Sequence, residues 1–266
     1  MKKKEGVNRD EESILIIDPD AVLQTIDLTK KFGDFIAVNN INFTIHRGEV
    51  FGLLGHNGAG KTTTINLLVG LIKPTSGEAL VCGYDVVEEP LEARRKIGLL
   101  PDNSGNYLHL TAWQNLEFFA ELADVPKSIR DKRLTDLLEL VGLTEWRNTK
   151  VEVYSRGMKQ RLGLAQSLVR DPDVLFFDEP TLGIDPEGVR EIRDLIRRLS
   201  KEEGKAILIC SHLLHEVSRV CDRVAVMRWG RIVAMGTIED LRNQLGLADQ
   251  IDLEEVFIQI HGREEA

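Results

Sequence analysis

A glycine-rich turn between an apolar run and an amphipathic segment constrains the fold of this chain most. The turn spans residues 55–62 and reads Gly-His-Asn-Gly-Ala-Gly-Lys-Thr. The apolar residues 50–54 before it predict a buried strand, and residues 61–70 after it carry apolar side chains at helical spacing. A strand, a glycine turn and a helix in this order predict an α/β fold with a parallel sheet and a phosphate-binding loop.

The residues of this loop have separate expected roles in holding a phosphate chain. Gly55, Gly58 and Gly60 allow backbone angles that other residues avoid, so consecutive N–H groups can point at phosphate oxygens. The N-terminus of the following helix adds a field that favours anions. We expect Lys61 to reach the β and γ phosphates, and the Thr62 hydroxyl to bind Mg²⁺. The predicted nucleotide-binding set is completed by His56, Asn57, Ala59 and Thr63.

A second apolar run ends in two adjacent carboxylates. Residues 174–177 are Val-Leu-Phe-Phe, which is typical of a central strand in a parallel sheet, and Asp178 and Glu179 follow. Ligands in such sheets bind beyond the carboxyl ends of the strands, so both carboxylates should lie beside the glycine loop. We expect Asp178 to reach Mg²⁺ through water, and Glu179 to orient and deprotonate the attacking water.

A third stretch, Tyr-Ser-Arg-Gly-Met at 154–158, precedes the second apolar run. Ser155 suits the N-cap of a helix that residues 158–169 predict. Together with the other two stretches, it resembles the signature of ATP-binding cassette (ABC) subunits of membrane transporters, usually Leu-Ser-Gly-Gly-Gln, in a variant form. The resemblance covers residues 22 to about 245. It implies that Ser155 and Gly157 complete the ATP site of a partner subunit.

The resemblance assigns roles to four further residues. Phe32 stands where the family carries an aromatic side chain that stacks on adenine. Asp185 lies in a loop that is implied to cross the subunit interface, and His212 stands where the family has a histidine that senses the γ phosphate. Asp102 occupies a position usually held by Gln. We expect it to be a catalytic and metal-binding residue that touches the metal and its water.

The same resemblance implies the organisation of the chain. The expected fold is an α/β P-loop NTPase (RecA-like) core with an N-terminal antiparallel β subdomain and an inserted α-helical subdomain. Residues 1–20 are predicted to be an N-terminal extension and residues 21–245 the ABC ATP-binding domain. Apolar residues at helical spacing place the helical insertion at about 103–170, and residues 246–266 are predicted to form a C-terminal tail helix.

Composition limits the partners and the compartment. The net charge of −9 argues against binding nucleic acid through a basic surface. The three cysteines lack Cys-x-x-Cys spacing, which excludes a disulfide framework and fits a reducing compartment. No run approaches the roughly 18 apolar residues of a membrane span. We therefore expect the membrane permease to be a separate chain, and this chain to be cytoplasmic and peripheral to the membrane through that permease.

The leading hypothesis is an ATPase that binds ATP and Mg²⁺ as a homodimer or heterodimer of ATP-binding subunits and powers transport, with export favoured over import. The alternative is a soluble ABC ATPase that acts on ribosomes or nucleic acid, but such proteins usually carry two cassettes or a long coiled coil. A non-catalytic ATP sensor is a second alternative, which Glu179 and His212 oppose. A GTPase is disfavoured because the sequence has no Asn-Lys-x-Asp stretch.

Overall fold

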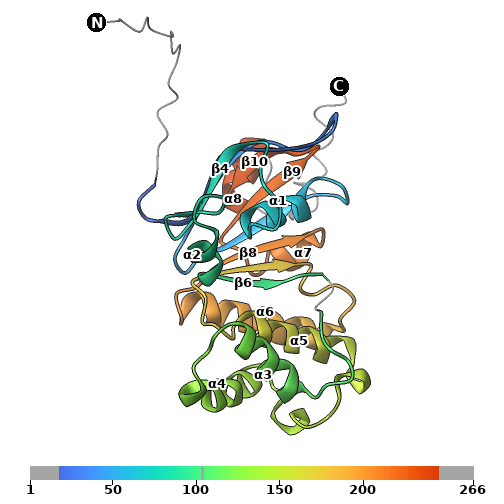
Figure 1. Ribbon diagram of the computed structural model, residues 1–266. Helices are drawn as coiled ribbons and strands as arrows, with labels where there is room; N and C mark the ends of the chain where they lie inside the picture. Colours follow the sequence, from blue (N-terminus) through green and yellow to red (C-terminus); the bar gives the residue numbers. More distant parts are fainter. Residues whose placement is uncertain (1–17, 103–104, 246–266) are drawn as a thin grey trace, which may run out of the picture.

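The computed structural model describes residues 18–102 and 105–245, and its centre is a six-stranded sheet (Figure 1). The strand order is β10-β9-β3-β8-β7-β6. Neighbouring strands from β9 to β6 pair in parallel, whereas β10 pairs antiparallel with β9. The strands are β3 (Val50–Leu54), β6 (Ile97–Leu100), β7 (Val174–Asp178), β8 (Ala206–Ser211), β9 (Arg223–Arg228) and β10 (Arg231–Gly236). Every residue of β3, β7 and β8 is buried, as expected of parallel strands that are covered on both faces.

A second, antiparallel sheet has the strand order β2-β1-β4-β5. Its strands are β1 (Ala21–Phe32), β2 (Phe35–His46), β4 (Ser76–Val81) and β5 (Tyr84–Asp85). Helix α1 (Lys61–Leu68) buries Ile65, Leu67 and Leu68 in a hydrophobic cluster that includes residues of both sheets. Helix α2 (Pro90–Arg95) adds Ala93 to that cluster. The glycine loop therefore leads from the central sheet into a helix that also packs against the antiparallel sheet.

The helical part of the molecule lies beyond the β6 edge of the central sheet, at the bottom of Figure 1. It contains α3 (Ala112–Leu122), α4 (Lys127–Leu140) and α5 (Arg156–Ser167), with short 3-10 turns at Thr144–Trp146 and Val151–Val153. Thr111 begins α3 with a capping box in which its hydroxyl and the Gln114 side chain satisfy each other's backbone N–H groups. These helices fall inside the predicted insertion of 103–170.

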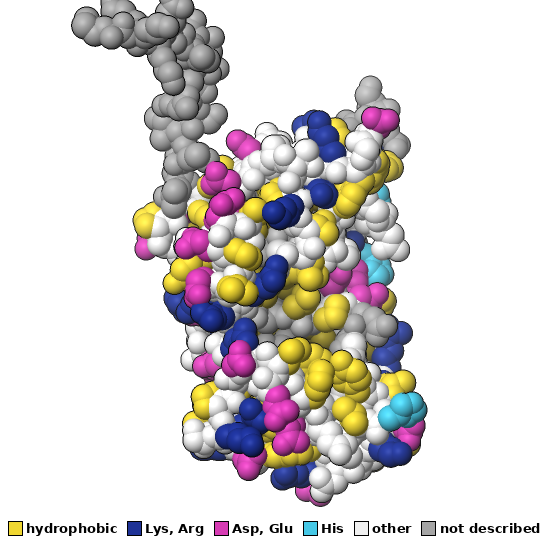
Figure 2. Space-filling view, in the orientation of Figure 1, with side chains coloured by type: hydrophobic (Ala, Val, Ile, Leu, Met, Phe, Trp, Pro, Cys, Tyr) yellow, Lys and Arg dark blue, Asp and Glu magenta, His cyan; other side chains and the backbone are white. Residues whose placement is uncertain are grey.

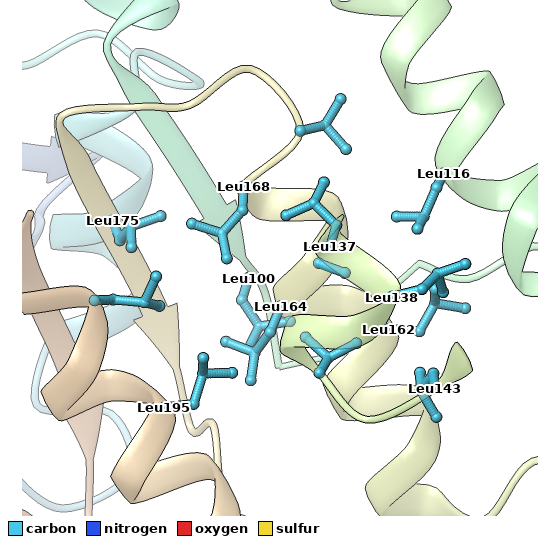
Figure 3. Close-up of a cluster of buried hydrophobic side chains, with 14 of the residues drawn as sticks. Leu100, Leu116, Leu137, Leu138, Leu143, Leu162, Leu164, Leu168, Leu175 and Leu195 are labelled. Carbon is cyan, nitrogen blue, oxygen red and sulfur yellow. The ribbon is translucent and has the colours of Figure 1, made fainter. Parts of the chain in front are cut away.

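Helix α5 joins the helical part to the central sheet. Figure 3 shows Leu164 and Leu168 on the side of Leu100 and Leu175, which belong to β6 and β7, while Leu162 lies nearer Leu138. All these leucines belong to one buried cluster. Gly98 of β6 permits the close approach, because a Cβ at this position would lie 2.3 Å from the Ser167 carbonyl oxygen.

Three further helices complete the described structure. Helix α6 (Pro186–Lys201) buries Ile192, Ile196 and Leu199 in the same cluster as α5. Helices α7 (Leu214–Val217) and α8 (Ile238–Leu245) follow β8 and β10. Val217 and Leu241 from these two helices pack against Leu54 and Val224 of the sheet.

The predicted fold class is confirmed by this architecture, with its parallel core, antiparallel β sheet and helical insertion. The predicted tail helix at 246–266 lies outside the described residues, and so does most of the N-terminal extension at 1–20. The domain boundaries remain predictions. None of the helices in the described ranges is long and apolar enough to span a bilayer.

Candidate nucleotide-binding site

A pocket of about 400 Å³ lies at the carboxyl ends of β3, β7 and β8. Its lining consists of the glycine loop, the residues that follow the strands, and part of β2. The lining residues are Phe35, Ala37, His56, Asn57, Gly58, Ala59, Gly60, Lys61, Thr62, Thr63, Asp102, Asp178, Glu179, Leu182 and His212. The structure thus gathers five separated segments of the sequence in the place that the parallel topology predicts.

The three glycines of the loop serve two different purposes. Gly58 and Gly60 have φ angles of 85° and 111°, which residues with a Cβ rarely adopt. Gly55 has an ordinary φ, but a Cβ there would lie 2.5 Å from the Met227 carbonyl oxygen of β9. Gly55 therefore allows close packing and Gly58 allows the turn, while Gly60 does both, because a Cβ there would lie 2.5 Å from the Ala37 carbonyl oxygen.

Lys61 begins helix α1 and is almost fully buried beneath the loop. Its Nζ donates hydrogen bonds to the carbonyl oxygens of Gly55 at 2.7 Å and His56 at 3.3 Å. The ammonium group is thus held inside the curve of the loop, beside the backbone groups that would face a phosphate chain. This is the position from which the predicted contact with β and γ phosphates requires only a side-chain movement.

Thr62 and Asp178 bring a hydroxyl and a carboxylate together. The Thr62 Oγ1 donates to the Asp178 Oδ2 at 2.9 Å. Burial raises the pKa of Asp178, and although the Thr62 hydrogen bond opposes this, the carboxylates of Glu179 and Asp102 raise the pKa further. Such a concentration of negative charge and oxygen ligands suits a hard divalent cation.

The donor set fits Mg²⁺ only together with a ligand that supplies further oxygens. Among residues 18–102 and 105–245, no group of three or more His, Cys, Asp or Glu side chains forms a metal site. Mg²⁺ is typically held by one or two carboxylates, waters and substrate phosphates rather than by a complete protein cage. Thr62 and Asp178 are the residues that would provide the protein share of such a site.

Glu179 is fixed at both carboxylate oxygens. His212 Nδ1 lies 2.8 Å from Oε1, and the Ser211 Oγ donates to Oε2 at 3.0 Å. The backbone N–H of Glu179 donates to the Cys210 carbonyl at 2.8 Å, and its φ of 50° is uncommon for a residue with a side chain. A carboxylate held in this way points in one direction, which a base that must meet a water molecule requires.

Phe32 does not line the pocket, whereas Phe35 does. The two residues are register partners on β1 and β2, so their side chains share one face of the hairpin. The Lys30 ammonium lies 5.0 Å from the Phe32 ring centroid, over its face. Phe32, the predicted adenine platform, therefore lies next to the pocket, and Phe35 is a pocket-lining aromatic residue that sequence analysis did not identify.

The residues from the signature and the following loop lie outside this pocket. Ser155 caps α5 by accepting a hydrogen bond from the Met158 N–H at 3.2 Å, and Gly157 packs against Ile184. Asp185 caps α6 by accepting from the N–H groups of Glu187 and Gly188. Ser155 and Asp185 are exposed. Within one chain, the structure does not bring them together with the Lys61 loop.

Ser211 is the functional neighbour that sequence analysis missed. It is the last residue of β8, directly before His212, and its hydroxyl also accepts a hydrogen bond from the Leu213 N–H at 3.0 Å. A polar residue at the end of an otherwise apolar parallel strand was the available signal.

Comparison with known proteins gives a consistent result. The family described as "ABC transporter" matches residues 38–182. The uncharacterized ABC transporter ATP-binding protein YhcH of Bacillus subtilis (strain 168) is 43% identical over 219 residues, which are 82% of this chain and 71% of that protein. The bacitracin transport ATP-binding protein BcrA of Bacillus licheniformis is 41% identical over 212 residues, covering 80% and 68% respectively.

Two solved structures share the fold. An ATP-binding subunit of an ABC transporter has a TM-score of 0.82 and 30% identity, covering 90% of this chain and 99% of the other. The ATP-binding cassette MJ0796, a dimer in a post-hydrolysis state bound to ADP and Pi, has a TM-score of 0.74 and 26% identity, covering 81% and 98%. The chain therefore belongs to the ABC transporter family, as one of its ATP-binding subunits. Members of this class are ATPases.

Proposed function

We propose that this subunit binds MgATP and pairs head-to-tail with a second ATP-binding subunit. The pair closes on ATP, opens after hydrolysis, and thereby drives export through a separate membrane permease. The observation that carries the proposal is the fixed Glu179 carboxylate, which shares a pocket with Lys61 and the Thr62–Asp178 pair. The pairing is favoured because Ser155 and Asp185 are exposed and lie outside the pocket of their own subunit.

In the proposed mechanism, each residue has one task. The loop N–H groups and Lys61 hold the β and γ phosphates, and Phe32 with Phe35 provides an aromatic surface for the base. Glu179 orients a water molecule in line with the γ phosphate and accepts its proton, while Ser211 and His212 keep the carboxylate directed. Mg²⁺, when bound by Thr62 and Asp178, would neutralise charge on the phosphate oxygens.

Two relatives and one neighbouring structure support the finer parts of this proposal. BcrA is named as a bacitracin transport protein, and another relative, LnrL of Bacillus subtilis (strain 168), as a linearmycin resistance ATP-binding protein. Removal of a toxic compound requires outward transport, which favours export. MJ0796 is a dimer that holds ADP and Pi, which favours paired subunits around the nucleotide. The alternative of a soluble ATPase acting on ribosomes or nucleic acid is not favoured, and the identity of the second subunit is left open.

We further propose that the permease docks on the groove between β6 and the helical part, which places this chain on the cytoplasmic face of the membrane. The groove has a volume of about 390 Å³ and includes Leu99, Phe119 and Leu122. Tyr107 and Phe118 are exposed and stack edge-on at 5.0 Å beside it. Figure 2 shows hydrophobic side chains gathered at this junction of sheet and helices. An exposed apolar surface of this kind is typical of a protein interface.

Hydrolysis is tested with Glu179→Gln, because Gln can position water but cannot take its proton. We expect turnover with MgATP to fall at least about 100-fold while ATP affinity is retained. Glu78→Gln, which changes an exposed carboxylate on β4, should keep full turnover. If the wild-type subunit did not hydrolyse ATP, the chain would be an ATP-binding sensor instead.

Docking is tested with Phe118→Glu, which puts a charge into the exposed aromatic pair. Co-purification with the permease should be lost while turnover of the isolated subunit stays within about twofold, since Phe118 does not line the ATP pocket. Lys132→Glu on α4 is the control and should keep the permease bound. Equal retention of the permease by both variants would contradict the assigned groove.

A further inference from the structure

Arg156 is an unpaired cation at an unfavourable place in the subunit. It is the first residue of α5, directly after the N-cap Ser155, and it is exposed. Within the part of the chain that the structure describes, its side chain forms no hydrogen bond or ion pair. The positive end of the helix dipole disfavours cations there, and the first turn of α5 contains no acidic residue to compensate. Among the described residues, no carboxylate forms an ion pair with this guanidinium.

The guanidinium of Arg156 lies beside the loop that follows β7, although it has no charged partner there among the residues that the structure describes. It lies beside Gly183, where a Cβ would be 2.6 Å from Nη1 and 2.7 Å from Cζ of Arg156. Gly183 also has a φ of 70°, which residues with a Cβ rarely adopt. Arg156 thus bridges the start of α5 and the loop that leads from Glu179 to the Asp185 cap, forming one exposed surface with Ser155.

We propose that Arg156 is a further catalytic residue, whose guanidinium contacts the γ phosphate of the ATP bound by the partner subunit. The proposal rests on the head-to-tail pairing proposed above. Arg suits this task because it is always charged and offers planar, paired N–H donors to phosphate oxygens. Charge spreads over the γ oxygens in the transition state, and an arginine supplied from another chain is an effective way to stabilise it. The guanidinium neither gives nor takes a proton; Glu179 performs that step.

The competing explanation is that Arg156 only packs on Gly183. Two substitutions separate charge from packing: Arg156→Met keeps a long side chain against Gly183 without the charge, and Arg156→Lys keeps the charge without the planar fork. A packing role requires the Met variant to work at least as well as the Lys variant. The phosphate contact requires the opposite order.

The first experiment uses the Glu179→Gln chain, in which ATP is bound but not hydrolysed, and measures the ATP concentration that gives half-maximal dimer by mass in solution. Arg156→Met should raise this concentration by about 10- to 100-fold, and Arg156→Lys by clearly less. ATP affinity of the dilute monomer should not change. Lys132→Met, which removes an exposed cation on α4, is the control and should leave the midpoint unchanged. A midpoint for Arg156→Met within twofold of the parent would overturn the proposal.

The second experiment determines which subunit's nucleotide Arg156 serves. Arg156→Met chains are mixed with Lys61→Ala chains, which cannot hold ATP but carry the native arginine. If Arg156 acts on the partner's nucleotide, mixing restores hydrolysis above the sum of the two separate preparations. No gain on mixing means that Arg156 serves its own subunit, and the proposal is wrong.

A second mixture of variants distinguishes two outcomes: that Arg156 does not contact the partner's nucleotide, or that the subunits do not pair head-to-tail at all. Ser155→Arg blocks the surface that should face the partner, so its mixture with Lys61→Ala should also regain hydrolysis. A gain in this mixture but none with Arg156→Met rejects the role of Arg156 alone. Absence of a gain in both mixtures, together with a Glu179→Gln chain that stays monomeric in ATP, rejects the head-to-tail pairing itself.

Discussion

The buried carboxylate of Asp178 lowers the stability of the folded subunit at neutral pH. It is the last residue of a fully buried strand, and burial raises the pKa of its carboxyl group. A carboxyl whose folded pKa is raised favours the folded state most while protonated, below its unfolded pKa, and loses that contribution as pH rises through the folded pKa. At neutral pH the ionised Asp178 therefore opposes folding, which is the trade-off that its proposed role in metal binding would entail.

The corresponding prediction is that Asp178→Asn stabilises the nucleotide-free subunit by about 1 kcal/mol at pH 7. The neutral amide can still accept the Thr62 hydrogen bond, and the gain should shrink as pH falls towards 4. Thermal unfolding between pH 7 and pH 4 measures the gain in stability. Mg²⁺-dependent hydrolysis should be lost in this variant. Unchanged or reduced stability at pH 7 would contradict the assigned electrostatics.

Asp173→Asn is the control of opposite sign. Burial opposes ionisation of Asp173, but its ion pairs with Arg47 and Lys96 prevail and lower the pKa of this carboxyl. A lowered pKa contributes stability above the unfolded value and loses it as pH falls through the folded one. Asp173→Asn should therefore lower the melting temperature at pH 7, and the difference from wild type should narrow under acid conditions.

Among the elements, α5 has the most varied surroundings. Its N-terminus carries the exposed Ser155 and Arg156, while Leu162 and Leu164 along its length and the C-cap Leu168 are buried. Figure 3 places Leu162 nearer Leu138 of α4, and Leu164 nearer Leu100 at the edge of the sheet. The orientation of the exposed surface formed by Ser155 and Arg156 therefore depends on how α5 packs against α4 on one side and against the central sheet on the other.

Leu162→Ala should lower the free energy of unfolding by about 2–5 kcal/mol, because it opens a cavity at this junction. Denaturant titration measures the change. Leu122→Ala on α3 removes an equally large but 69% exposed side chain and should change it by less than about 0.5 kcal/mol. Equal effects of the two substitutions would show that the junction of α4 and α5 contributes little.

The sequence predicts which segments form strands or helices better than it predicts how these elements are arranged in space. The continuous apolar run at Val174 predicts β7, because a parallel strand is buried on both faces. The helical spacing of apolar residues around Leu162 predicts α5, because one face of that helix is buried. The strand orders of the two sheets depend on pairings between distant segments, which no local pattern specifies. The same reason explains the site: Lys61 and Glu179 are recognisable from their own stretches, whereas Ser211 becomes meaningful only when β8 lies beside β7.

The whole molecule presents two chemically related surfaces that do not meet within one chain. One is the pocket formed by the Lys61 loop and Glu179, and the other is the exposed surface of Ser155 and Arg156. We propose that the second surface of each subunit covers the first surface of its partner. The three native thiols interfere little with a chemical test, because burial raises the pKa values of Cys82, Cys210 and Cys221 and keeps these thiols protonated.

The most direct measurement is cross-linking of two variants in the Glu179→Gln, Cys82→Ser background, one with Ser155→Cys and the other with Asn57→Cys, treated with a short bifunctional thiol reagent. We expect a product of twice the 29.9 kDa chain mass in the mixture with ATP, and far less with ADP or with either variant alone. Absence of this product in ATP, or its formation by each variant alone as readily as by the mixture, would contradict the head-to-tail arrangement.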